Sequence, residues 1–366
     1  MISISILIPC LQERGFIRPC LESVLDFDVP TNAELLEILV MDGGSTDGTR
    51  DIVQQMARDE SRIRLIDNPG RIQSTGLNIG LDLAAGKYII RLDAHSVYPR
   101  DYLALLIETS LRTGCDNVGG LFITQQRGTG YESAVIQALT THKFGVGDAG
   151  YRTGAKEGPA DTVPYGCFRK ELFDRIGRFD ERLVRAQDYE LNRRIIAAGG
   201  CVWRNPAVRV NYYQQPTMRS FIRKQAILEA PYNAYLWYLA PHAFALRHAT
   251  TGVFALGVIA GLVVSPFSQT VRAVFGAVMA VYFAIAVVAA IQQAIGYREP
   301  RHILVLPIAF FLYHFLHGLG LLYGLANLAV GTAPVQKLKE PWPGAGRFRA
   351  WPMPHPTDAL RVTPST

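Results

Sequence analysis

Cysteine is scarce in this sequence, and the few residues present stand singly. The sequence has five cysteines, at positions 10, 20, 115, 167 and 201. They show none of the paired spacings typical of zinc sites. Isolated thiols of this kind are normally kept reduced inside cells. We therefore expect Cys10, Cys20, Cys115, Cys167 and Cys201 to be reduced thiols without a catalytic role.

Several other signals are absent as well. The opening MISISILIPC has no basic region before its apolar residues, and its pattern predicts a first strand rather than a secretory leader, so we expect the soluble part to stay in the cytosol. The glycine-rich stretch after residue 42 lacks the G-x-G-x-x-G fingerprint, which removes the main support for a hydride-transfer enzyme. The net charge is +6, but the sequence has no recognised nucleic-acid-binding motif. It also shows no internal repeats.

Long apolar runs are confined to the last third of the chain. Residues 1–230 mix charged and apolar positions, whereas three later runs approach or exceed the about 20 residues with which a helix crosses a bilayer. We therefore predict a soluble domain, a basic and aromatic membrane-interface segment, three membrane segments and a proline-rich tail. Their expected bounds are 1–215 for the domain, 216–248 for the interface segment, 249–331 for the membrane part (249–267, 271–295 and 303–330) and 332–366 for the tail.

The soluble part alternates strand and helix signals. ISILIP, LEILVMD, IRLID and YIIRLD are apolar and strand-like, and helix-like stretches lie between them, to about residue 25, near 49–60 and near 74–84. This alternation predicts an α/β fold with a mostly parallel sheet covered by helices. Ligands bind beyond the carboxyl ends of such strands, so the residues after Ile8, Met41 and Leu92 are expected around one crevice.

The stretch LVMDGGSTDGT places an acid and glycines directly after a strand. Asp42 ends the strand, Gly44 permits a tight turn, and the side chains of residues 45–47 can cap a following helix. Backbone N–H groups at a helix start can meet a polar or anionic ligand, although a plain strand-to-helix turn would look the same. The first strand ends at Pro9, and Glu13 brings a second acid to the same rim.

RLDAHSVYP ends the fourth strand with two groups that bind divalent cations. Residues two apart in a strand point to the same side, so Asp93 and His95 can both face the crevice. The alternative is a strand-end acid beside a surface histidine. The position of the pair at the end of a third apolar strand of the same sheet favours the metal site.

Two later motifs add candidate residues. In QDYELNRRI, Asp188 lies in the first turn of a helix above the apolar Leu191 and Ile195, while Glu190 points about 200° away, so we choose Asp188 as the acid that faces the crevice. An acid that only stabilises the helix dipole is the alternative. VPYGCFRKELF predicts a turn at Gly166 and Cys167, where the backbone can approach a ligand.

Taken together, these motifs resemble glycosyltransferase family 2 enzymes of GT-A fold. The resemblance covers about residues 3–215 and rests on Pro9 and Glu13, DGGSTDGT, GLNIGLDLAAGKYIIRLDAH, GCFRKELFDRIGRFDE and QDYELNRRI, in that order. Within the family, RIQSTGLN, LDAH in place of the usual D-x-D, and apolar segments after the soluble domain are most similar to the ExoA-type glucosyltransferases of succinoglycan and related exopolysaccharide assembly.

The resemblance implies a doubly wound, mostly parallel GT-A sheet followed by transmembrane helices, and it implies roles for the candidate residues. Asp188 would be the catalytic base of an inverting transfer. Asp93 and His95 would hold a divalent cation, with Mn²⁺ at least as effective as Mg²⁺ because imidazole is softer than carboxylate. Alternatively, Asp93 alone would bind the metal and His95 would contact a phosphate oxygen. The UDP-sugar donor would be bound by Pro9, Glu13, Asp42, Gly44, Ser74 and Asp93. The acceptor would be bound by Gly166, Cys167, Arg219 and Arg223.

The expected reaction moves a hexose, glucose above all, from a UDP-sugar to a polyprenyl-diphosphate-linked saccharide. Arg219 and Arg223 precede aromatic residues in the interface segment, and they can either hold the lipid diphosphate or only anchor the segment to headgroups. QAILE from Gln225 replaces the Q-x-x-R-W motif of processive relatives, which favours single sugar addition. Other polysaccharide-assembly proteins are possible partners, and nucleic acid is not an expected one.

Two alternatives remain at this point: a nucleotidyltransferase, and a non-catalytic scaffold with a degenerate domain. The expected location is the bacterial inner membrane with the catalytic domain facing the cytosol. Three spans would put the basic tail residues, among them Lys337 and Arg347, outside, against the positive-inside tendency. We favour three membrane segments. The alternative is that the third segment, which contains His314 and His317, is re-entrant or interfacial, and this would return the tail to the cytosol.

Overall fold

The structure is a computed structural model that describes residues 1–336. It divides into two compact units, which we describe separately: Met1–Ile123 with Gly154–Asn211, and Thr124–Thr153 with the chain from Tyr212 onward. The expected domain boundary at residue 215 lies close to the third change of unit, between Asn211 and Tyr212. The inclusion of residues 124–153 in the second unit did not follow from the sequence. The expected tail largely lies outside the described residues.

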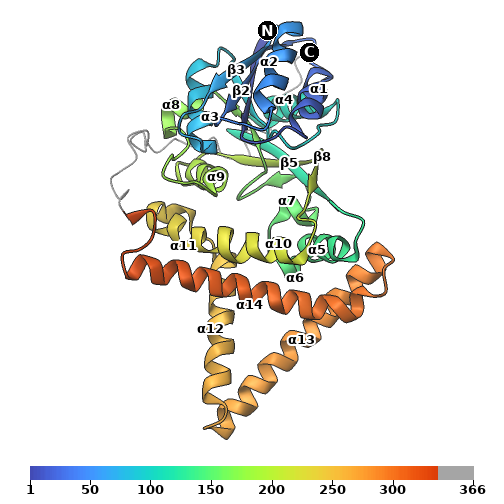
Figure 1. Ribbon diagram of the computed structural model, residues 1–366, viewed down its shortest axis with the longest axis vertical. Helices are drawn as coiled ribbons and strands as arrows, with labels where there is room; N and C mark the ends of the chain where they lie inside the picture. The colour runs from blue at the N-terminus through green and yellow to red at the C-terminus, as the bar shows by residue number, and fades with distance from the viewer. Residues whose placement is uncertain (337–366) are drawn as a thin grey trace, which may run out of the picture. The chain divides into compact units, whose positions relative to one another are not determined.

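The first unit is built on one mixed sheet in the order β3-β2-β1-β4-β7-β5-β8-β6 (Figure 1). Its first four strands are parallel, and β7 pairs antiparallel with both β4 and β5. The strands are β1 (Ile2–Cys10), β2 (Ala33–Asp42), β3 (Ile63–Asp67), β4 (Tyr88–Arg91), β5 (Asn117–Gln125), β6 (Gly158–Pro159), β7 (Gly166–Arg169) and β8 (Val202–Tyr213). The four strands read from the sequence are therefore confirmed.

Helices cover both faces of this sheet, because alternate strand residues are apolar on both sides. Ile4, Ile6 and Ile8 of β1 pack with one set of helices, and Leu7 packs with the other, all at 0% exposure. The first set is α1 (Ile17–Leu25), α2 (Thr49–Asp59) and α4 (Tyr102–Thr113). The second set is α3 (Gln73–Leu83), α8 (Glu171–Ile176) and α9 (Gln187–Ala197).

The strand register brings the carboxyl ends of the parallel strands to one edge. Cys10 at the end of β1 pairs with Asp42 at the end of β2, and Asp42 pairs with Asp67 at the end of β3. On the other side of β1, Arg91 at the end of β4 pairs with Leu7. The loops after these strands therefore start from a common edge, as expected for a sheet of this kind.

The cysteines differ from expectation. Cys115 and Cys201 form a disulfide that joins the start of β5 to the start of β8, so the prediction of five reduced thiols was wrong. Their separation of 86 residues hid the pair, since no local spacing marks it. Cys10, Cys20 and Cys167 are free and buried, and burial raises the pKa of each thiol, which leaves them unreactive.

The second unit is helical. Short helices come first: α5 (Tyr131–Thr141), α6 (Lys143–Val146) and α7 (Gly150–Thr153). The basic and aromatic segment follows as a nearly continuous rod of α10 (Met218–Ile222), the π-helical η1 (Arg223–Glu229) and α11 (Ala230–Leu239), and a 3-10 turn, η2 (Pro241–Ala243), ends it. This segment is therefore helical.

Three long apolar helices complete the described part of the second unit: α12 (Leu246–Val264), α13 (Gln269–Tyr297) and α14 (His302–Ala329). By length and composition each is able to cross a membrane, which matches the three apolar runs of the sequence. Ser268 caps α13, its hydroxyl accepting from the Val271 amide at 3.3 Å. Residues 265–268 alone separate α12 from α13, so the connection between the two helices is short.

Candidate active site

The loop after β1 is hydrogen-bonded onto the loop after β2. The Gln12 amide donates to the Ser45 hydroxyl at 2.8 Å, and the Glu13 amide donates to Thr49 Oγ1 at 2.8 Å. The Gln12 side chain bonds Thr46 in turn. These bonds fix Glu13 beside the strand ends.

Asp42 is buried at the centre of this junction. Its carboxylate accepts from the amides of Gly44 and Ser45 at 3.0 Å, from the Ser45 hydroxyl at 2.5 Å and from Arg50 Nη1 at 2.8 Å. Burial by itself opposes ionisation, but the bonds from Ser45, Arg50 and Gly44 outweigh it and hold the pKa of Asp42 below its usual value. These bonds therefore favour the ionised form of Asp42.

The helix after this turn begins later than the sequence suggested. The N-cap of α2 is Gly48 in a left-handed conformation, and no side chain caps it. Ser45 and Thr46 bond Asp42 and Gln12 instead, while Asp47 accepts from the Thr49 amide. Of residues 45–47, which we predicted to cap the helix, only Asp47 bonds its first turn. Asp47 stands one position before the N-cap residue, Gly48, and accepts from the amide of Thr49.

A buried cation stands behind Asp93. Arg91, which is 4% exposed, donates from Nη2 to Asp93 Oδ1 at 2.8 Å, and its guanidinium lies 4.9 Å from the centre of the Tyr165 ring. Gln73 Nε2 donates to the same Asp93 oxygen at 3.1 Å. Both bonds engage Oδ1, and the other carboxylate oxygen faces His95.

His95 lies between two acids. Its Nδ1 is 3.1 Å from Glu13 Oε1, and its Nε2 is 3.9 Å from Asp93 Oδ2. A histidine that donates from Nδ1 to a carboxylate keeps the lone pair of Nε2 directed away from it. The structure thus brings Glu13, Asp93 and His95 together, from the loops after β1 and β4.

The first turn of α9 is joined to this group through Gln73. Gln187 hydrogen-bonds the Gln73 side chain, which bonds Asp93 in turn. Asp188 follows directly, half-buried, with its Oδ1 accepting from the Tyr189 amide at 2.9 Å. Burial of Arg91 lowers its tendency to hold a proton, but the charges of Asp93 and Asp188 more than compensate and raise the Arg91 pKa.

Glu190 has a different role from Asp188. It is 2% exposed and forms an ion pair within α9 with Arg194, which also donates to the carbonyls of Ile176 and Arg178. Glu190 is thus engaged in packing α9, and the choice of Asp188 as the acid that faces the crevice stays a prediction.

Backbone strain gathers near these residues. Three residues other than glycine have a left-handed backbone, which such residues rarely adopt. They are Gln12, Tyr165 and Ala186, with φ values of 59°, 61° and 61°. They lie in the β1 loop, beside Arg91 and at the N-cap of α9, respectively. Such strain persists where the surrounding structure enforces it, most often at functional sites.

Other predicted site residues are placed differently. The backbone of Pro9 lies in β1 and Gly44 forms the turn at φ +85°, both near Asp42. Ser74 is fully buried, and its hydroxyl donates to the Leu183 carbonyl at 3.3 Å. The structure therefore places Ser74 in the packing between α3 and the loop before α9.

The predicted turn at Gly166 and Cys167 was wrong. Both residues lie in strand β7 and are buried, and Cys167 is 0% exposed. A Cβ on Gly166 would lie 2.5 Å from Asn117 Oδ1, so packing inside the sheet explains the glycine. The burial of both residues gives no support to the predicted acceptor-binding role of Gly166 and Cys167.

Arg219 and Arg223 belong to the second unit. They lie on α10 and at the start of η1, and both side chains are exposed. The sequence missed three residues of the first unit, Gln73, Arg91 and Gln187. Gln73 adjoins the predicted Ser74, and Arg91 stands two positions before Asp93, but neither position has a local signal that separates it from a surface residue.

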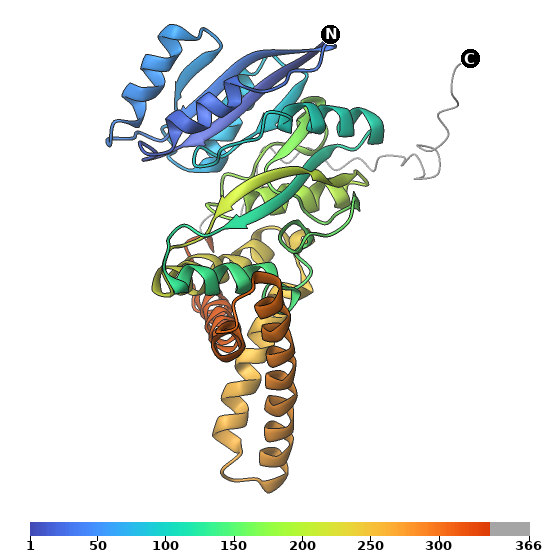
Figure 2. The ribbon, with the colours of Figure 1, turned by 90° about the vertical axis from the view of Figure 1, so that its right-hand side faces the viewer.

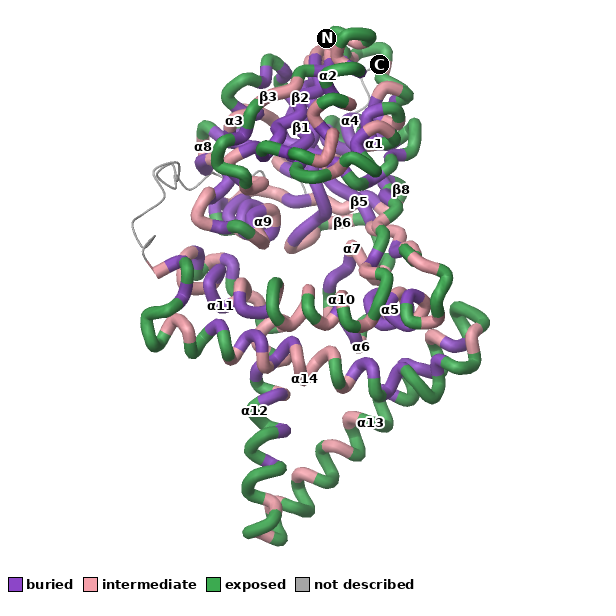
Figure 3. The backbone as a smooth tube through the Cα atoms, in the orientation of Figure 1, coloured by how far each residue is buried: buried purple, intermediate pink, exposed green. Residues whose placement is uncertain are grey.

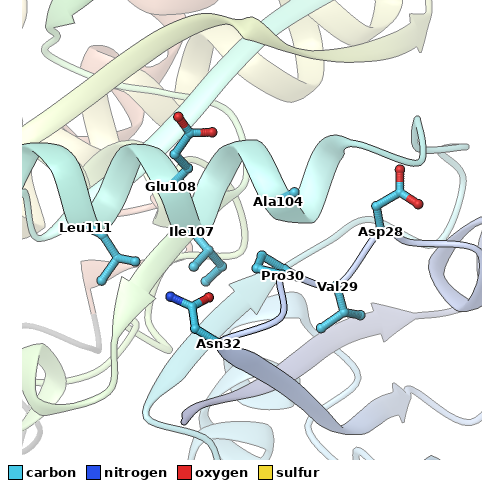
Figure 4. A pocket seen from close by; sticks show the side chains of 8 residues that line it. All are labelled: Asp28, Val29, Pro30, Asn32, Ala104, Ile107, Glu108 and Leu111. Carbon is cyan, nitrogen blue, oxygen red and sulfur yellow. The ribbon is translucent and has the colours of Figure 1, made fainter.

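A hollow of about 320 Å³ lies elsewhere in the first unit, between α4 and the loop before β2 (Figure 4). Asn32, Ile107 and Leu111 line it together with Asp28 and Glu108. It adjoins the amino end of β2, at the sheet edge opposite Asp42. None of the candidate site residues lines this hollow.

Comparison with known proteins gives one family. The family model described as Glycosyl transferase family 2 matches residues 5–177. "Succinoglycan biosynthesis protein ExoA" of Rhizobium meliloti (strain 1021) is 37% identical over 210 residues, which are 57% of this chain and 62% of that protein. The matched part thus spans less than two thirds of that relative.

Two further proteins match over most of this chain. A "Dolichyl N-acetyl-alpha-D-glucosaminyl phosphate 3-beta-D-2,3-diacetamido-2,3-dideoxy-beta-D-glucuronosyltransferase" of Methanococcus voltae is 28% identical over 339 residues, 88% of this chain and 97% of that protein. The solved "Mannosyltransferase PcManGT from Pyrobaculum calidifontis in complex with GDP-Man and Mn2+" superposes with a TM-score of 0.54 at 18% identity, covering 88% of this chain and 86% of that one. The latter similarity confirms the predicted GT-A fold.

The geometry predicts that Arg91 is required for a stable site. Arg91→Met should lower the free energy of unfolding by about 3 kcal/mol, because removing one partner of a buried ion pair leaves the other without its counter-charge. Arg91→Lys should lose less, since it keeps the charge but not the planar contact with Tyr165. Thermal unfolding of the purified protein measures both changes. Arg58→Met, on the exposed end of α2, is the control and should change stability by under about 0.5 kcal/mol. Equal losses in Arg91→Met and Arg58→Met would contradict the prediction.

Proposed function

We propose that the protein is a membrane-anchored, inverting hexosyltransferase of exopolysaccharide biosynthesis, in line with the glycosyltransferase family 2 model that matches residues 5–177. The family implies a nucleotide-sugar donor and a glycan acceptor. Our finer proposal is a UDP-sugar donor, most simply UDP-glucose, and a polyprenyl-diphosphate-linked saccharide acceptor. The observation that supports it best is the convergence of Glu13, Asp93, His95 and Asp188 on one network at the edge of a GT-A sheet.

The donor nucleotide is proposed to bind beside Asp42. This carboxylate is held ionised, and the turn at Gly44 keeps the backbone open next to it. Pro9 and Glu13 border the same edge from β1 and its loop. Because uracil offers an N–H and two carbonyls, a fixed acceptor beside backbone groups is suited to bind it. We leave Ser74 out of direct contact with the donor because its hydroxyl is engaged inside the fold.

The donor diphosphate is proposed to share a divalent cation with Asp93 and His95. Ligand atoms lie about 2.1 Å from Mg²⁺ or Mn²⁺, so two of them can be up to about 4 Å apart, and the 3.9 Å between Asp93 Oδ2 and His95 Nε2 fits that limit. Among residues 1–336 no group of three acidic, histidine or cysteine side chains could hold an ion. Two protein ligands suit a cation whose other positions are filled by phosphate oxygens and water. When bound, such an ion neutralises the charge that develops on the departing nucleoside diphosphate.

Asp188 is proposed as the general base. Its carboxylate is half-buried, interacts electrostatically with the Arg91 guanidinium and lies in the first turn of α9. A base in this role takes the proton from the acceptor hydroxyl as its oxygen attacks the anomeric carbon and the bond to the diphosphate oxygen breaks. One direct displacement inverts the anomeric centre, so an α-linked donor gives a β-linked product.

The lipid acceptor is proposed to be recognised in the second unit. Arg219 and Arg223 are exposed on the rod of α10 and η1, which precedes the apolar helices. Guanidinium groups bind phosphate oxygens in pairs, so two of them on one rod match a diphosphate. Gly166 and Cys167 are not retained as acceptor-binding residues because both are buried.

Asp188→Asn should abolish transfer while the protein stays folded, because the amide cannot accept the proton. The assay is release of UDP from UDP-glucose by the detergent-solubilised protein, with a lipid-linked acceptor present. We expect a loss of about 10² to 10⁴-fold. Unchanged release by Asp188→Asn would refute its role as base, and no release by wild type with several UDP-sugars and acceptors would favour a scaffold.

His95→Asp should change the preference for the metal ion. Wild type should be activated by Mn²⁺ at least as well as by Mg²⁺, and a carboxylate at position 95 should improve Mg²⁺ use relative to Mn²⁺ because it is a harder ligand. UDP release titrated with each ion gives the two half-activating concentrations. His95→Ala serves as the control and should weaken activation by both ions. An equal loss with both ions in His95→Asp would show that this imidazole is not a metal ligand.

Arg223→Ala should raise the Michaelis constant for the lipid acceptor and leave that for the UDP-sugar unchanged. A charge-assisted hydrogen bond contributes about 1.5–3 kcal/mol, so the expected rise is roughly tenfold or more. Initial rates at varied acceptor and at varied donor separate the two constants. Arg127→Ala, also exposed in the second unit, is the matched control. If the two variants behave alike, the arginines act in membrane anchoring rather than in acceptor recognition.

A further inference from the structure

Helix α14 is more buried within the protein than α12 and α13 are. In the most apolar 18-residue stretch of each helix, 22% of α12 and 17% of α13 is buried, against 44% of α14. Figure 3 shows the same contrast, with long exposed stretches along α12 and α13 and alternating buried and exposed turns along α14. A large part of α14 therefore faces protein rather than its surroundings.

Both ends of α14 are bonded to the layer of helices that precedes the apolar hairpin. At the start, the Tyr131 hydroxyl of α5 lies 3.2 Å from His302 Nδ1, and the Arg301 guanidinium lies 4.2 Å from the centre of the Tyr131 ring. At the end, Asn327 Nδ2 donates to the Tyr235 hydroxyl of α11 at 3.1 Å. The two ends of the helix are thus held by α5 and by α11.

The helices α5 and α11 lie on the same side of any membrane. In the described chain, the first helix able to span begins at Leu246, after both of them. A spanning helix of 28 residues would instead place its ends about 42 Å apart on opposite sides. The contacts of His302 and Asn327 with α5 and α11 are incompatible with such a crossing.

Glycines let α14 lie tightly against this layer. A Cβ on Gly320 would be 2.0 Å from the Ala226 carbonyl oxygen of η1, and one on Gly324 would be 2.7 Å from the backbone of Pro231 in α11. On another side, a Cβ on Gly318 would be 2.0 Å from the Thr251 carbonyl oxygen, in the second turn of α12. Backbone approaches this close exclude an intervening lipid layer.

The path of α14 runs across the hairpin. In Figure 1 the helix extends crosswise to α12, and in Figure 2 it is seen nearly end-on while α12 and α13 still run lengthwise. It meets α12 near the first turns, at Thr251, and its Leu306 and Phe310 pack with Ala286 and Ala290 in the last part of α13. Both contacts lie at the open end of the hairpin, away from the α12–α13 connection.

An apolar stripe remains exposed on α14. Leu304, Ile308, Leu312 and Tyr323 are 78%, 59%, 40% and 61% exposed, and the first three recur every four residues along one side. No charged side chain lies between His302 and Ala329. Acyl chains suit this stripe, since the hairpin of α12 and α13 fixes the position of the bilayer next to it.

We propose that α14 lies in the plane of the membrane, half-immersed in the leaflet on the side of α5 and α11, and that only α12 and α13 cross the bilayer. The buried side of α14 is covered by α5, η1 and α11 and by parts of α12 and α13, and its exposed stripe contacts acyl chains. The chain after α14 then returns to the side of α5. The described chain after α14, up to Gln336, then lies on the same side as Arg219 and Arg223, and the basic tail positions lie outside the described residues.

Single cysteines in the full-length protein test the number of crossings. Thr332→Cys reports the chain after α14, Phe267→Cys the tip of the hairpin, and Thr129→Cys the turn before α5, and all three positions are exposed. The native cysteines are buried or paired, so the unsubstituted protein is the background control. An impermeant maleimide is added to sealed membranes of each orientation. We expect Thr332→Cys to be labelled from the side of Thr129→Cys, and Phe267→Cys from the other. Labelling of Thr332→Cys together with Phe267→Cys would overturn the proposal.

Immersion depth gives an independent measurement. Spin labels at positions 304, 308, 312 and 323 are compared for accessibility to oxygen and to a water-soluble nickel complex in vesicles. An in-plane helix gives four similar depths. A spanning helix gives depths that differ along the about 29 Å between positions 304 and 323, which would refute the proposal. Labels at positions 278 and 288 of α13, both exposed valines, calibrate the scale.

Discussion

A single buried cation organises the edge of the first unit. The Arg91 guanidinium is 4% exposed, and burial of an unpaired charge would be costly. Asp93 satisfies it at 2.8 Å, the Tyr165 ring lies 4.9 Å away, and the charge of Asp188 adds to the field that raises the Arg91 pKa. These three partners come from the end of β4, the start of β7 and the first turn of α9. The arginine therefore couples segments that are far apart in the sequence, and the position of each acid depends on it.

The division of the Asp93 carboxylate follows from that constraint. Arg91 and Gln73 occupy Oδ1, and Oδ2 is directed toward His95, whose other nitrogen meets Glu13. A carboxylate with one oxygen fixed and the other directed at an imidazole is preorganised for a cation without needing a third protein ligand. Gln73 continues to Gln187, so the same network sets the start of α9 and with it the position of Asp188. The proposed metal ligands and the proposed base are thus oriented by one set of bonds.

The sequence predicted what depends on local pattern. Apolar alternation located the strands, and the glycines after Asp42 located the turn. It failed where neighbours are distant in the chain. Nothing near Cys115 or Cys201 marks their disulfide, and a glycine followed by a cysteine suggested a turn at Gly166, where packing against Asn117 in fact demands glycine within a strand. Arg91 looked like an ordinary strand residue, because its importance comes from Tyr165 and from Asp188, which lies almost a hundred positions further on.

The membrane end shows the same limit for a physical reason. Over an apolar window of 18 residues, mean hydropathy is 1.5 in α12, 2.6 in α13 and 1.8 in α14, so this measure alone ranks α14 above α12 as a membrane span. Hydropathy measures the free-energy cost of placing side chains in hydrocarbon. A helix covered half by protein and half by acyl chains is as apolar as a helix that crosses the bilayer, so hydropathy does not distinguish the two. What distinguishes the two cases is where the ends are held and how close the backbone lies to its neighbours. In α14 those features are the bonds of His302 and Asn327 and the small residues Gly318, Gly320 and Gly324. Replacing residues of the apolar stripe by other apolar residues would leave both the hydropathy and the orientation of α14 unchanged. Larger residues at the three glycines would instead push α14 away from its neighbours and so remove the close packing on which the in-plane orientation depends.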